Sequence, residues 1–207
     1  MHIIIVRHGV TDHNLSRRIQ GQVDTPLNAQ GLQQAAELGR ALSDEAIDHV
    51  YSSDLRRARQ TTEAVLRANR AGLPVDFTPA LRERHYGEYQ DQPLPHIYLE
   101  YEEFGDGRED RAPAGGESLS AFHARIGAFW AGLLSRHSAG TILLSAHGGV
   151  TRSLMTHALG EDLAFRHSLK QGNCCLNRLE RRDGQRFELT LVNSLDHLSA
   201  PTVLPAM

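Results

Sequence analysis

HIIIVRHG, at residues 2–9, is the stretch that decides the fold, because a short apolar run leads directly into Arg7, His8 and Gly9. TILLSAHGG, at residues 141–149, repeats the same order far downstream. Short continuous aliphatic runs are typical of strands that are buried on both faces of a parallel sheet. We therefore expect an α/β protein in which each of these two strands ends at a histidine.

The two histidines, His8 and His147, are expected to lie close together. Ligands of open α/β sheets bind beyond the carboxyl ends of the strands, and each histidine follows such an end. A glycine follows each histidine, and we interpret Gly9 and Gly148 as positions where the backbone turns sharply and approaches a ligand. The two imidazoles therefore predict a functional site at one edge of the sheet.

Along the rest of the chain, expected strands alternate with expected helices, which is the pattern of βαβ units. The strands are expected at residues 2–6, 47–52, 74–77 and 141–146, with two closing strands at about 174–180 and 187–193. The closing pair is predicted to be a hairpin around Arg182, Asp183 and Gly184, because Asp-Gly suits a tight turn. The central sheet is therefore expected to be mostly parallel.

Three helices are predicted from apolar positions that recur three and four residues apart. Their expected N-terminal caps are Asn28, then Ser53 or Asp54, then Ser118. Their expected inward faces are Leu32, Ala35, Ala36, Gly39 and Leu42 in the first, Leu55, Ala58, Thr62, Val65 and Leu66 in the second, and Leu119, Phe122, Ile126, Phe129, Trp130 and Leu133 in the third. Residues 88–116 are acidic, aromatic and rich in Pro and Gly, which indicates an irregular or partly helical flap.

Length and composition fit one domain over residues 1–207 that carries this flap. The net charge of −3 gives no attraction to nucleic acid or to an anionic membrane. Without a long apolar run or a signal segment, a cytoplasmic location is expected. The two cysteines, Cys174 and Cys175, are adjacent in an expected strand, so we expect packed, reduced thiols rather than a disulfide.

The expected strand ends bring together groups that suit a phosphate ester. The guanidinium groups of Arg7 and Arg57 can form bidentate hydrogen bonds to phosphate oxygens, and a helix that starts near Asp54 adds backbone donors. Such a pocket repels a proton from His8, which keeps the imidazole neutral and nucleophilic. The arrangement predicts a covalent phosphohistidine on His8.

His147 and Glu83 complete the predicted chemistry. A protonated His147, together with the arginines, would stabilise the charge on the equatorial oxygens of the transition state. Glu83 is left for proton transfer, first to the departing alkoxide and then from the incoming water or alcohol.

These residues resemble the histidine phosphatase superfamily, whose best-known branch is the cofactor-dependent phosphoglycerate mutases. The resemblance rests on RHGVTDHN at residues 7–14 and SSDLRRARQT at residues 52–61, and it extends over nearly the whole chain. It implies a three-layer α/β/α fold, a nucleophile at His8, an acid at Glu83 and a second histidine at His147. Arg57 matches the phosphate-binding arginine because it precedes the alanine, whereas Arg56 and Arg59 are interpreted as solvated.

The resemblance also implies which residues contact the substrate. They are Thr11, Asn14, Gln20, Gly21, Arg84, Tyr86 and Gly148. The implied partner is a small phosphorylated metabolite, no metal ion and no cofactor are implied, and a homodimer is left open.

Departures from the mutase pattern favour a phosphomonoesterase. Gly149 stands where mutases often carry asparagine, and GGESL at residues 115–119 is similar to phosphatase members. The flap is short, with Arg108 and Arg111 as its only match to the paired arginines of the mutases. A phosphoglycerate mutase is the alternative, supported by residues 84–87, and an α-ribazole phosphatase or a sugar phosphatase fits equally well.

Two other classes of function are less consistent with the sequence. A metal-dependent hydrolase could use His8, His147, Asp12 and Glu83, but two arginines beside a dication are electrostatically unfavourable and no zinc-binding spacing is present. A non-catalytic binding protein would have lost a nucleophile or an acid, and neither is missing here. A chelator test and turnover of any phosphomonoester separate these classes.

Overall fold

A six-stranded sheet forms the middle layer of the protein, whose computed structural model describes residues 1–69, 72–94, 108–182 and 185–202. The strands are β1 (His2–Arg7), β2 (His49–Ser53), β3 (Val75–Thr78), β4 (Thr141–Ala146), β5 (Leu176–Glu180) and β6 (Glu188–Ser194), in the order β3-β2-β4-β1-β5-β6. The first four are parallel, whereas β5 is antiparallel to β1 and β6 to β5. The expected mostly parallel sheet is confirmed.

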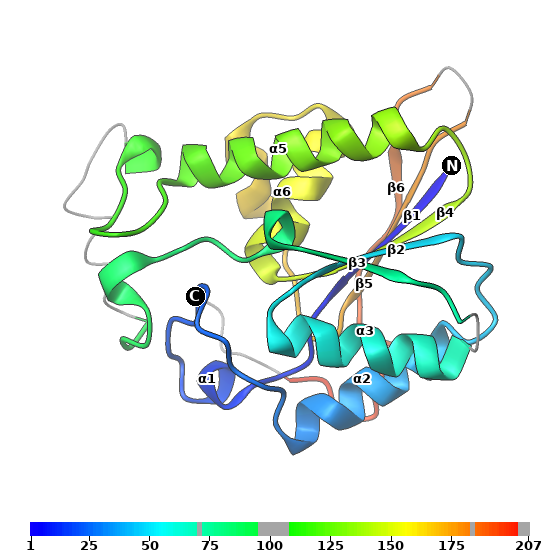
Figure 1. The fold of residues 1–207 in the computed structure, drawn as a ribbon, viewed down its shortest axis with the longest axis horizontal. Helices are drawn as coiled ribbons and strands as arrows, with labels where there is room; N and C mark the ends of the chain where they lie inside the picture. Colours follow the sequence, from blue (N-terminus) through cyan, green and yellow to red (C-terminus); the bar gives the residue numbers. More distant parts are fainter. Residues whose placement is uncertain (70–71, 95–107, 183–184, 203–207) are drawn as a thin grey trace.

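Helices cover both faces of this sheet. In Figure 1, α5 (Leu119–Arg136) and α6 (Gly148–Leu159) lie above the strands, and α2 (Ala29–Ala41) and α3 (Arg56–Asn69) lie below them. The short elements are α1 (Asp12–Leu15) and the 3-10 turns η1 (Pro79–Leu81), η2 (Gly87–Tyr89), η3 (Arg108–Asp110) and η4 (Leu163–Ser168). The expected three-layer α/β/α arrangement is confirmed.

The apolar run in β1 is continuous because both faces of the strand are covered. Ile3 and Ile5 belong to the buried cluster that includes the inner faces of α5 and α6. Ile4 and Val6 belong to the cluster that includes α2. Successive side chains of a strand point to opposite faces, so a strand between two helical layers needs an apolar residue at every position.

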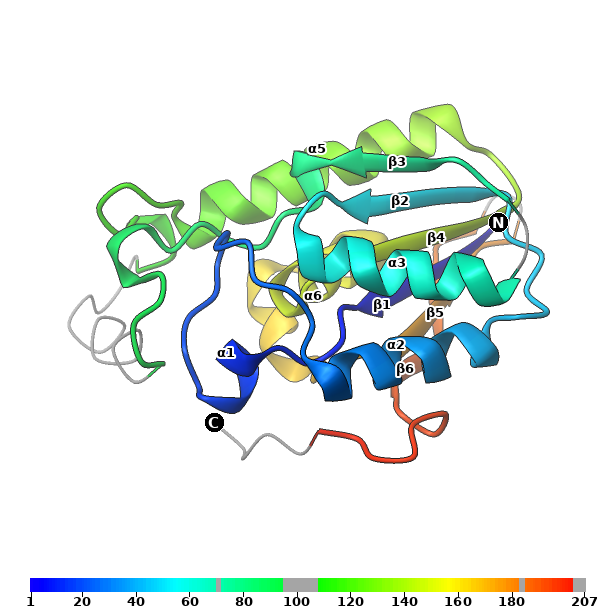
Figure 2. The ribbon, with the colours of Figure 1, turned by 60° about the horizontal axis from the view of Figure 1, so that its bottom comes forward.

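The register of β1 and β4 fixes the relative position of the two histidines. Arg7 pairs with Ala146, so His8 and His147 are the next residues of two adjacent parallel strands. In Figure 2, α1 and the segments that flank residues 95–107 lie on the side to which the arrowheads of β2 and β3 point. The parts of the expected flap that the structure describes, 88–94 and 108–116, are irregular with short 3-10 turns, and 95–107 lies outside the described residues.

The inward face of α2 differs from the sequence-based expectation. Leu32 is 50% exposed and Ala36 is exposed, so these two assignments were wrong. The helix instead buries Gln34, whose Oε1 accepts a hydrogen bond from the backbone N–H of Val10 at 3.1 Å. A polar contact with the β1–α1 connection therefore determines the rotation of α2. All six apolar positions expected to face inward on α5 are buried.

The cysteines lie in a turn and not in a strand. Strand β5 begins at Leu176, and Cys174 adopts a left-handed conformation with φ of 52°. Both thiols are free and buried, as expected. Strands β5 and β6 form the expected antiparallel pair, and Asp183 and Gly184 of the expected turn lie outside the described residues. Within the described part of the chain, no helix has the length and apolar character needed to cross a membrane.

Candidate active site

The two histidines that follow β1 and β4 meet at the carboxyl ends of the strands. The ring centroids of His8 and His147 are 5.2 Å apart, and the ring planes are inclined at 60°. Their side chains are 2% and 0% exposed, respectively. The expectation that both imidazoles share one edge of the sheet agrees with this geometry.

His8 is held by its own neighbour. Its Nδ1 lies 2.7 Å from the carbonyl oxygen of Gly9. A carbonyl oxygen only accepts hydrogen bonds, so Nδ1 carries the proton and Nε2 keeps its lone pair. Burial, followed by the charges of Arg57 and Arg7, holds the pKa of His8 well below its usual value. The side chain is therefore neutral, with a nucleophilic Nε2.

The glycines that follow the histidines differ in their packing. A Cβ at Gly9 would lie 2.5 Å from the carbonyl oxygen of Gly31, so this position is restricted by packing against the start of α2. A Cβ at Gly148 would make only ordinary contacts, the nearest at 3.5 Å from Arg7 Nε. Their expected approach to a ligand stays a prediction.

His147 is held through its other nitrogen. Its Nε2 lies 2.8 Å from the hydroxyl oxygen of Ser53, at the end of β2, and its Nδ1 is buried without a partner in the described residues. Burial, followed by the charge of Arg57, lowers the pKa of His147 well below its usual value. In the free protein His147 is therefore neutral, and its protonation during the reaction, which the expected charge stabilisation requires, stays a prediction.

Two buried guanidinium groups flank the histidines. Arg7 Nη1 donates to the carbonyl oxygen of Gln171 at 2.6 Å. Arg57 donates from Nη1 to Val23 O and from Nη2 to Gly21 O, both at 2.7 Å. Burial lowers the pKa of Arg57 to about 10, so it remains a cation at neutral pH. The Nε atoms of both arginines are buried and have no partner within the described part of the chain.

Glu83 lies against the N-terminus of α6. Its Oε2 accepts from the backbone N–H of Gly149 and its Oε1 from that of Arg84, each at 2.9 Å. A Cβ at Gly149 would lie 2.3 Å from Oε1, so only glycine leaves room for the carboxylate. In the sequence, Gly149 stood out because it lacks the polar side chain of the mutases. In the structure, its backbone N–H binds the carboxylate of the candidate acid.

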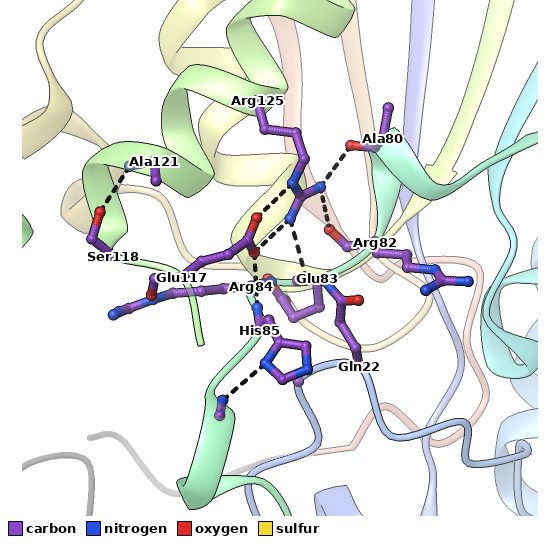
Figure 3. A network of polar contacts seen from close by, with 12 residues as sticks. Gln22, Ala80, Arg82, Glu83, Arg84, His85, Glu117, Ser118, Ala121 and Arg125 are labelled. Atoms are coloured by element: carbon purple, nitrogen blue, oxygen red, sulfur yellow. Dashed lines mark hydrogen bonds and ion pairs between the residues drawn. The ribbon is translucent and has the colours of Figure 1, made fainter. Parts of the chain in front are cut away.

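A network behind Glu83 fixes the backbone of residues 80–85 (Figure 3). Arg125 donates to Ala80 O at 2.8 Å and to Arg82 O at 3.0 Å, and it binds both carboxylate oxygens of Glu117 at 2.8 Å. Glu117 in turn accepts from the backbone N–H of His85 at 2.9 Å. Sequence reasoning missed Arg125, which lies in no motif, and gave no role to Glu117, although it lies in the GGESL segment at residues 115–119.

The start of α3 is capped by a distant loop. The backbone N–H of Arg56 donates to Asp24 Oδ1 at 2.6 Å. Ser53 Oγ accepts from the backbone N–H of Leu55, one residue before the helix, at 3.3 Å and also contacts His147, whereas the carboxylate of Asp54 binds Arg82 at 2.7 and 2.6 Å. The expected phosphate contact with this helix start is therefore not supported, because a carboxylate already occupies its first donor.

A further assignment in α3 was also wrong. Arg59 does not extend into solvent: its guanidinium carbon lies 4.0 Å from the ring centroid of Phe77.

The expected substrate-contact residues of the first motif support one another. Thr11 and Asn14 form a capping box at α1. Asn14 Oδ1 accepts from Thr11 N at 3.1 Å. Gln20 Oε1 accepts from Thr11 Oγ1 at 2.9 Å, and Gly21, with φ of 50°, binds Arg57 through its carbonyl oxygen. Gln20 and Gly21 therefore hold other site residues in place.

Arg84 and Tyr86 lie beside the candidate acid. The Arg84 guanidinium carbon is 5.2 Å from the ring centroid of Tyr86. Arg84 Nε donates to Glu117 O at 2.8 Å, and the residue is 5% exposed. The structure thus joins this pair to the network behind Glu83.

Asn173 is a site residue that sequence reasoning missed. Its Nδ2 lies 3.2 Å from both the carbonyl oxygen of His8 and Asn14 Oδ1. The backbone N–H of Cys174 donates to the same His8 carbonyl at 3.2 Å. This buried turn therefore supports the nucleophile from below the sheet edge. The available signal was Gly172-Asn173, a pair typical of turns, immediately before β5.

A family model of the histidine phosphatase superfamily (branch 1) matches residues 3–194. The chain belongs to this superfamily. It is 31% identical over 211 residues to a probable phosphoglycerate mutase GpmB of Salmonella choleraesuis (strain SC-B67), covering 98% of this chain and 97% of the relative. The predicted family is therefore confirmed.

Solved structures of other histidine phosphatases have the same fold. A mycobacterial glucosyl-3-phosphoglycerate phosphatase in complex with VO3 is 32% identical, with a TM-score of 0.79 over 93% of this chain and 98% of that one. The alpha-ribazole phosphatase of Shigella flexneri is 28% identical, with a TM-score of 0.83 over 94% and 96%. Members of this superfamily are phosphatases or phosphoglycerate mutase-like phosphoryl transferases, so the protein is an enzyme, as expected.

Proposed function

We propose that this histidine phosphatase is a phosphomonoesterase that hydrolyses small phosphorylated metabolites through a phosphohistidine on Nε2 of His8. The observation that carries the proposal is a group of three buried nitrogens that have no hydrogen-bond partner among the described residues: Arg7 Nε, Arg57 Nε and His147 Nδ1. Buried polar atoms normally have hydrogen-bond partners. A phosphoryl group beside His8 would supply acceptor oxygens to these nitrogens.

The charge balance of the site supports an anionic substrate. Arg7 and Arg57 are buried cations. Burial lowers the pKa of both arginines, and the negative charge of Glu83 partly opposes this effect by raising both pKa values. Two positive charges against one negative charge favour a phosphate ester, and planar guanidinium groups match its oxygens. Burial, together with the same two charges, lowers the pKa of His8 and keeps it unprotonated, which its role as a nucleophile requires.

The proposed reaction has two steps. In the first, Glu83 takes up a proton from solvent as the ester binds, His8 Nε2 attacks phosphorus, the bond from phosphorus to the ester oxygen breaks, and Glu83 gives its proton to the departing oxygen. In the second, Glu83 takes a proton from water, the water oxygen attacks phosphorus, and the bond between nitrogen and phosphorus breaks. Inorganic phosphate leaves, Glu83 releases its proton to solvent, and His8 and Glu83 return to their starting states.

Hydrolysis is favoured over mutase chemistry by Gly149. The backbone N–H of Gly149 binds Glu83, and the residue has no side chain that could hold a substrate between two transfers. The two solved relatives reported above are named as phosphatases, whereas the relative of 31% identity is named as a probable phosphoglycerate mutase. That name and the Arg84–Tyr86 pair keep a phosphoglycerate mutase as the second candidate. An α-ribazole phosphatase or a sugar phosphatase fits the proposed reaction equally well.

The covalent step is tested by trapping the intermediate. Substrate labelled in its phosphoryl group is mixed with the enzyme and quenched without acid, because phosphohistidine is acid-labile. We expect label on the wild type that survives alkali, and none on His8→Ala. Label that persists on His8→Ala, or activity that chelators abolish, would contradict the proposal.

The choice between hydrolysis and transfer is tested with 3-phosphoglycerate. A site open to water releases the phosphoryl group to water, whereas a mutase must keep water out while the substrate reorients. We expect slow phosphate release or no reaction with 3-phosphoglycerate, and clear phosphate release with small sugar or aryl phosphates. Rapid formation of 2-phosphoglycerate, stimulated by 2,3-bisphosphoglycerate and without net phosphate release, would establish the mutase instead.

A further inference from the structure

The hydroxyl group of Ser53 links strand β2 to the second histidine. Ser53 is fully buried at the end of β2, and its Oγ lies 2.8 Å from His147 Nε2. The same oxygen accepts a hydrogen bond from the backbone N–H of Leu55 at 3.3 Å. The hydroxyl therefore has one proton to donate, and within the described residues His147 Nε2 is the acceptor in reach.

These contacts select one form of neutral His147. A neutral imidazole carries one proton, on either Nδ1 or Nε2. If Nε2 carried it, the imidazole and the hydroxyl would both be donors, and the buried Ser53 proton would have no acceptor, which is unfavourable. If the hydroxyl donates to Nε2, both groups are satisfied. The proton of His147 then resides on Nδ1.

Within the described residues, His147 Nδ1 is the ring nitrogen without a hydrogen-bond partner. It is buried, and the centroids of the two imidazole rings are 5.2 Å apart. A lone pair on Nδ1 would repel phosphate oxygens, whereas an N–H would bind one. We propose that Ser53 is a positioning residue that fixes the proton of His147 on Nδ1, so that His147 acts as a neutral hydrogen-bond donor to the phosphoryl group. The identity of this acceptor rests on the proposed function, but the position of the proton does not.

The position of the proton is measurable without any substrate. In the full-length protein with 15N-labelled histidine, the long-range couplings of each ring show which nitrogen carries the proton, and His147→Gln identifies the His147 signals by their loss. At neutral pH we expect His147 protonated on Nδ1 alone. A wild-type spectrum with the proton on Nε2 would overturn the proposal, even if no Ser53 variant folds.

Variants at neighbouring serines separate positioning from packing. Ser53→Ala should move the His147 proton partly or wholly to Nε2 and lower kcat by about 10- to 100-fold with a smaller change in KM. Ser53→Thr, which keeps the hydroxyl, should restore both. Ser52→Ala is the matched control, because it also removes a buried hydroxyl from β2, bonded to Thr62 and to the Ser53 carbonyl but not to a histidine. It should change neither the spectrum nor kcat.

Two further results would overturn the inference. One is Ser53→Ala that retains the Nδ1 proton and the wild-type kcat. The other is an equal loss of kcat in Ser53→Ala and Ser52→Ala, which would indicate packing alone. A spectrum that behaves as expected in an enzyme that turns over no phosphate ester would leave the proton assignment intact and would refute the proposed function.

Discussion

The ends of β1 and β4 carry the same local sequence and hold their histidines in opposite ways. His8 and His147 each follow a buried parallel strand and precede a glycine. His8 bonds through Nδ1 to the carbonyl of Gly9, its next residue. His147 bonds through Nε2 to Ser53, on the neighbouring strand. The result is a lone pair on Nε2 in one case and a buried Nδ1 in the other.

This difference shows that a repeated motif does not imply a repeated role. A contact within the motif selects the nitrogen of His8, so the form of a nucleophile is set locally. A contact between strands selects the nitrogen of His147, so its function depends on the assembled sheet. Burial and the two arginines keep both rings neutral, and hydrogen bonds alone distinguish them.

The largest expected effect separates the two histidines directly. His8→Ala removes the nucleophile, and we expect kcat to fall by on the order of 10⁴-fold or more. His147→Ala removes a hydrogen-bond donor, and we expect a loss of about 10²- to 10³-fold with slow phosphoryl labelling of His8 still detectable. Steady-state rates and labelling measure both. Losses of equal size, with no label in either variant, would contradict the different roles proposed for His8 and His147.

A second prediction concerns the acid bound at the end of β4. Glu83→Gln removes proton transfer, which matters most for a strongly basic leaving group. We expect a loss in kcat on the order of 10²-fold or more with an alkyl phosphate and a smaller loss with an activated aryl phosphate. Equal losses with both substrates would assign the acid elsewhere, with His147 as the next candidate.

A smaller effect distinguishes the two glycines after His147. A Cβ at Gly149 overlaps Glu83 Oε1, whereas a Cβ at Gly148 makes only ordinary contacts. We expect Gly149→Ala to lower kcat for an alkyl phosphate by about tenfold through displacement of Glu83, and Gly148→Ala to lower it by less than about threefold. Steady-state kinetics of the two variants, with Tm as a control for folding, measure these losses. A larger loss of kcat in Gly148→Ala than in Gly149→Ala would contradict the prediction.

The smallest effect is on stability, and both strand ends contribute to it. The pKa values of His8 and His147 are lowered in the folded protein, so the unfolded chain binds protons more readily below about pH 6.5. The free energy of unfolding should therefore fall as the pH drops below this value and recover above it. Thermal denaturation between pH 5 and 7, a window of about two units around the ordinary histidine pKa, measures this slope. His147→Gln should reduce the slope, and an unchanged slope would contradict a neutral, buried His147.

Local sequence was sufficient for much of the fold. The continuous apolar runs of β1 and β4 predicted buried parallel strands, and the spacing on α5 predicted its inward face, because the period of each pattern is a property of the element itself. The order of the elements predicted the sheet. The motifs at residues 7–14 and 52–61, with Glu83 and His147, indicated the residues that the structure brings together.

Positions that depend on a distant partner were not predictable in this way. The exposure of Leu32 follows from the contact of Gln34 with Val10, and the cap of α3 comes from Asp24. Asn173 reaches His8 from 165 residues away along the chain. Such contacts do not change the spacing of apolar residues in either segment, so the sequence pattern does not reveal them.

The sequence by itself determined the layers of the fold and the types of reactive group at the strand ends. The tertiary structure decided that Gly149 holds Glu83 and that His147 is neutral. It also decided which nitrogen of each histidine is free. The physical reason is that hydrogen-bond direction and desolvation depend on the atoms that surround a group in space. For His147 those atoms belong to Ser53 and Arg57, on another strand and another helix.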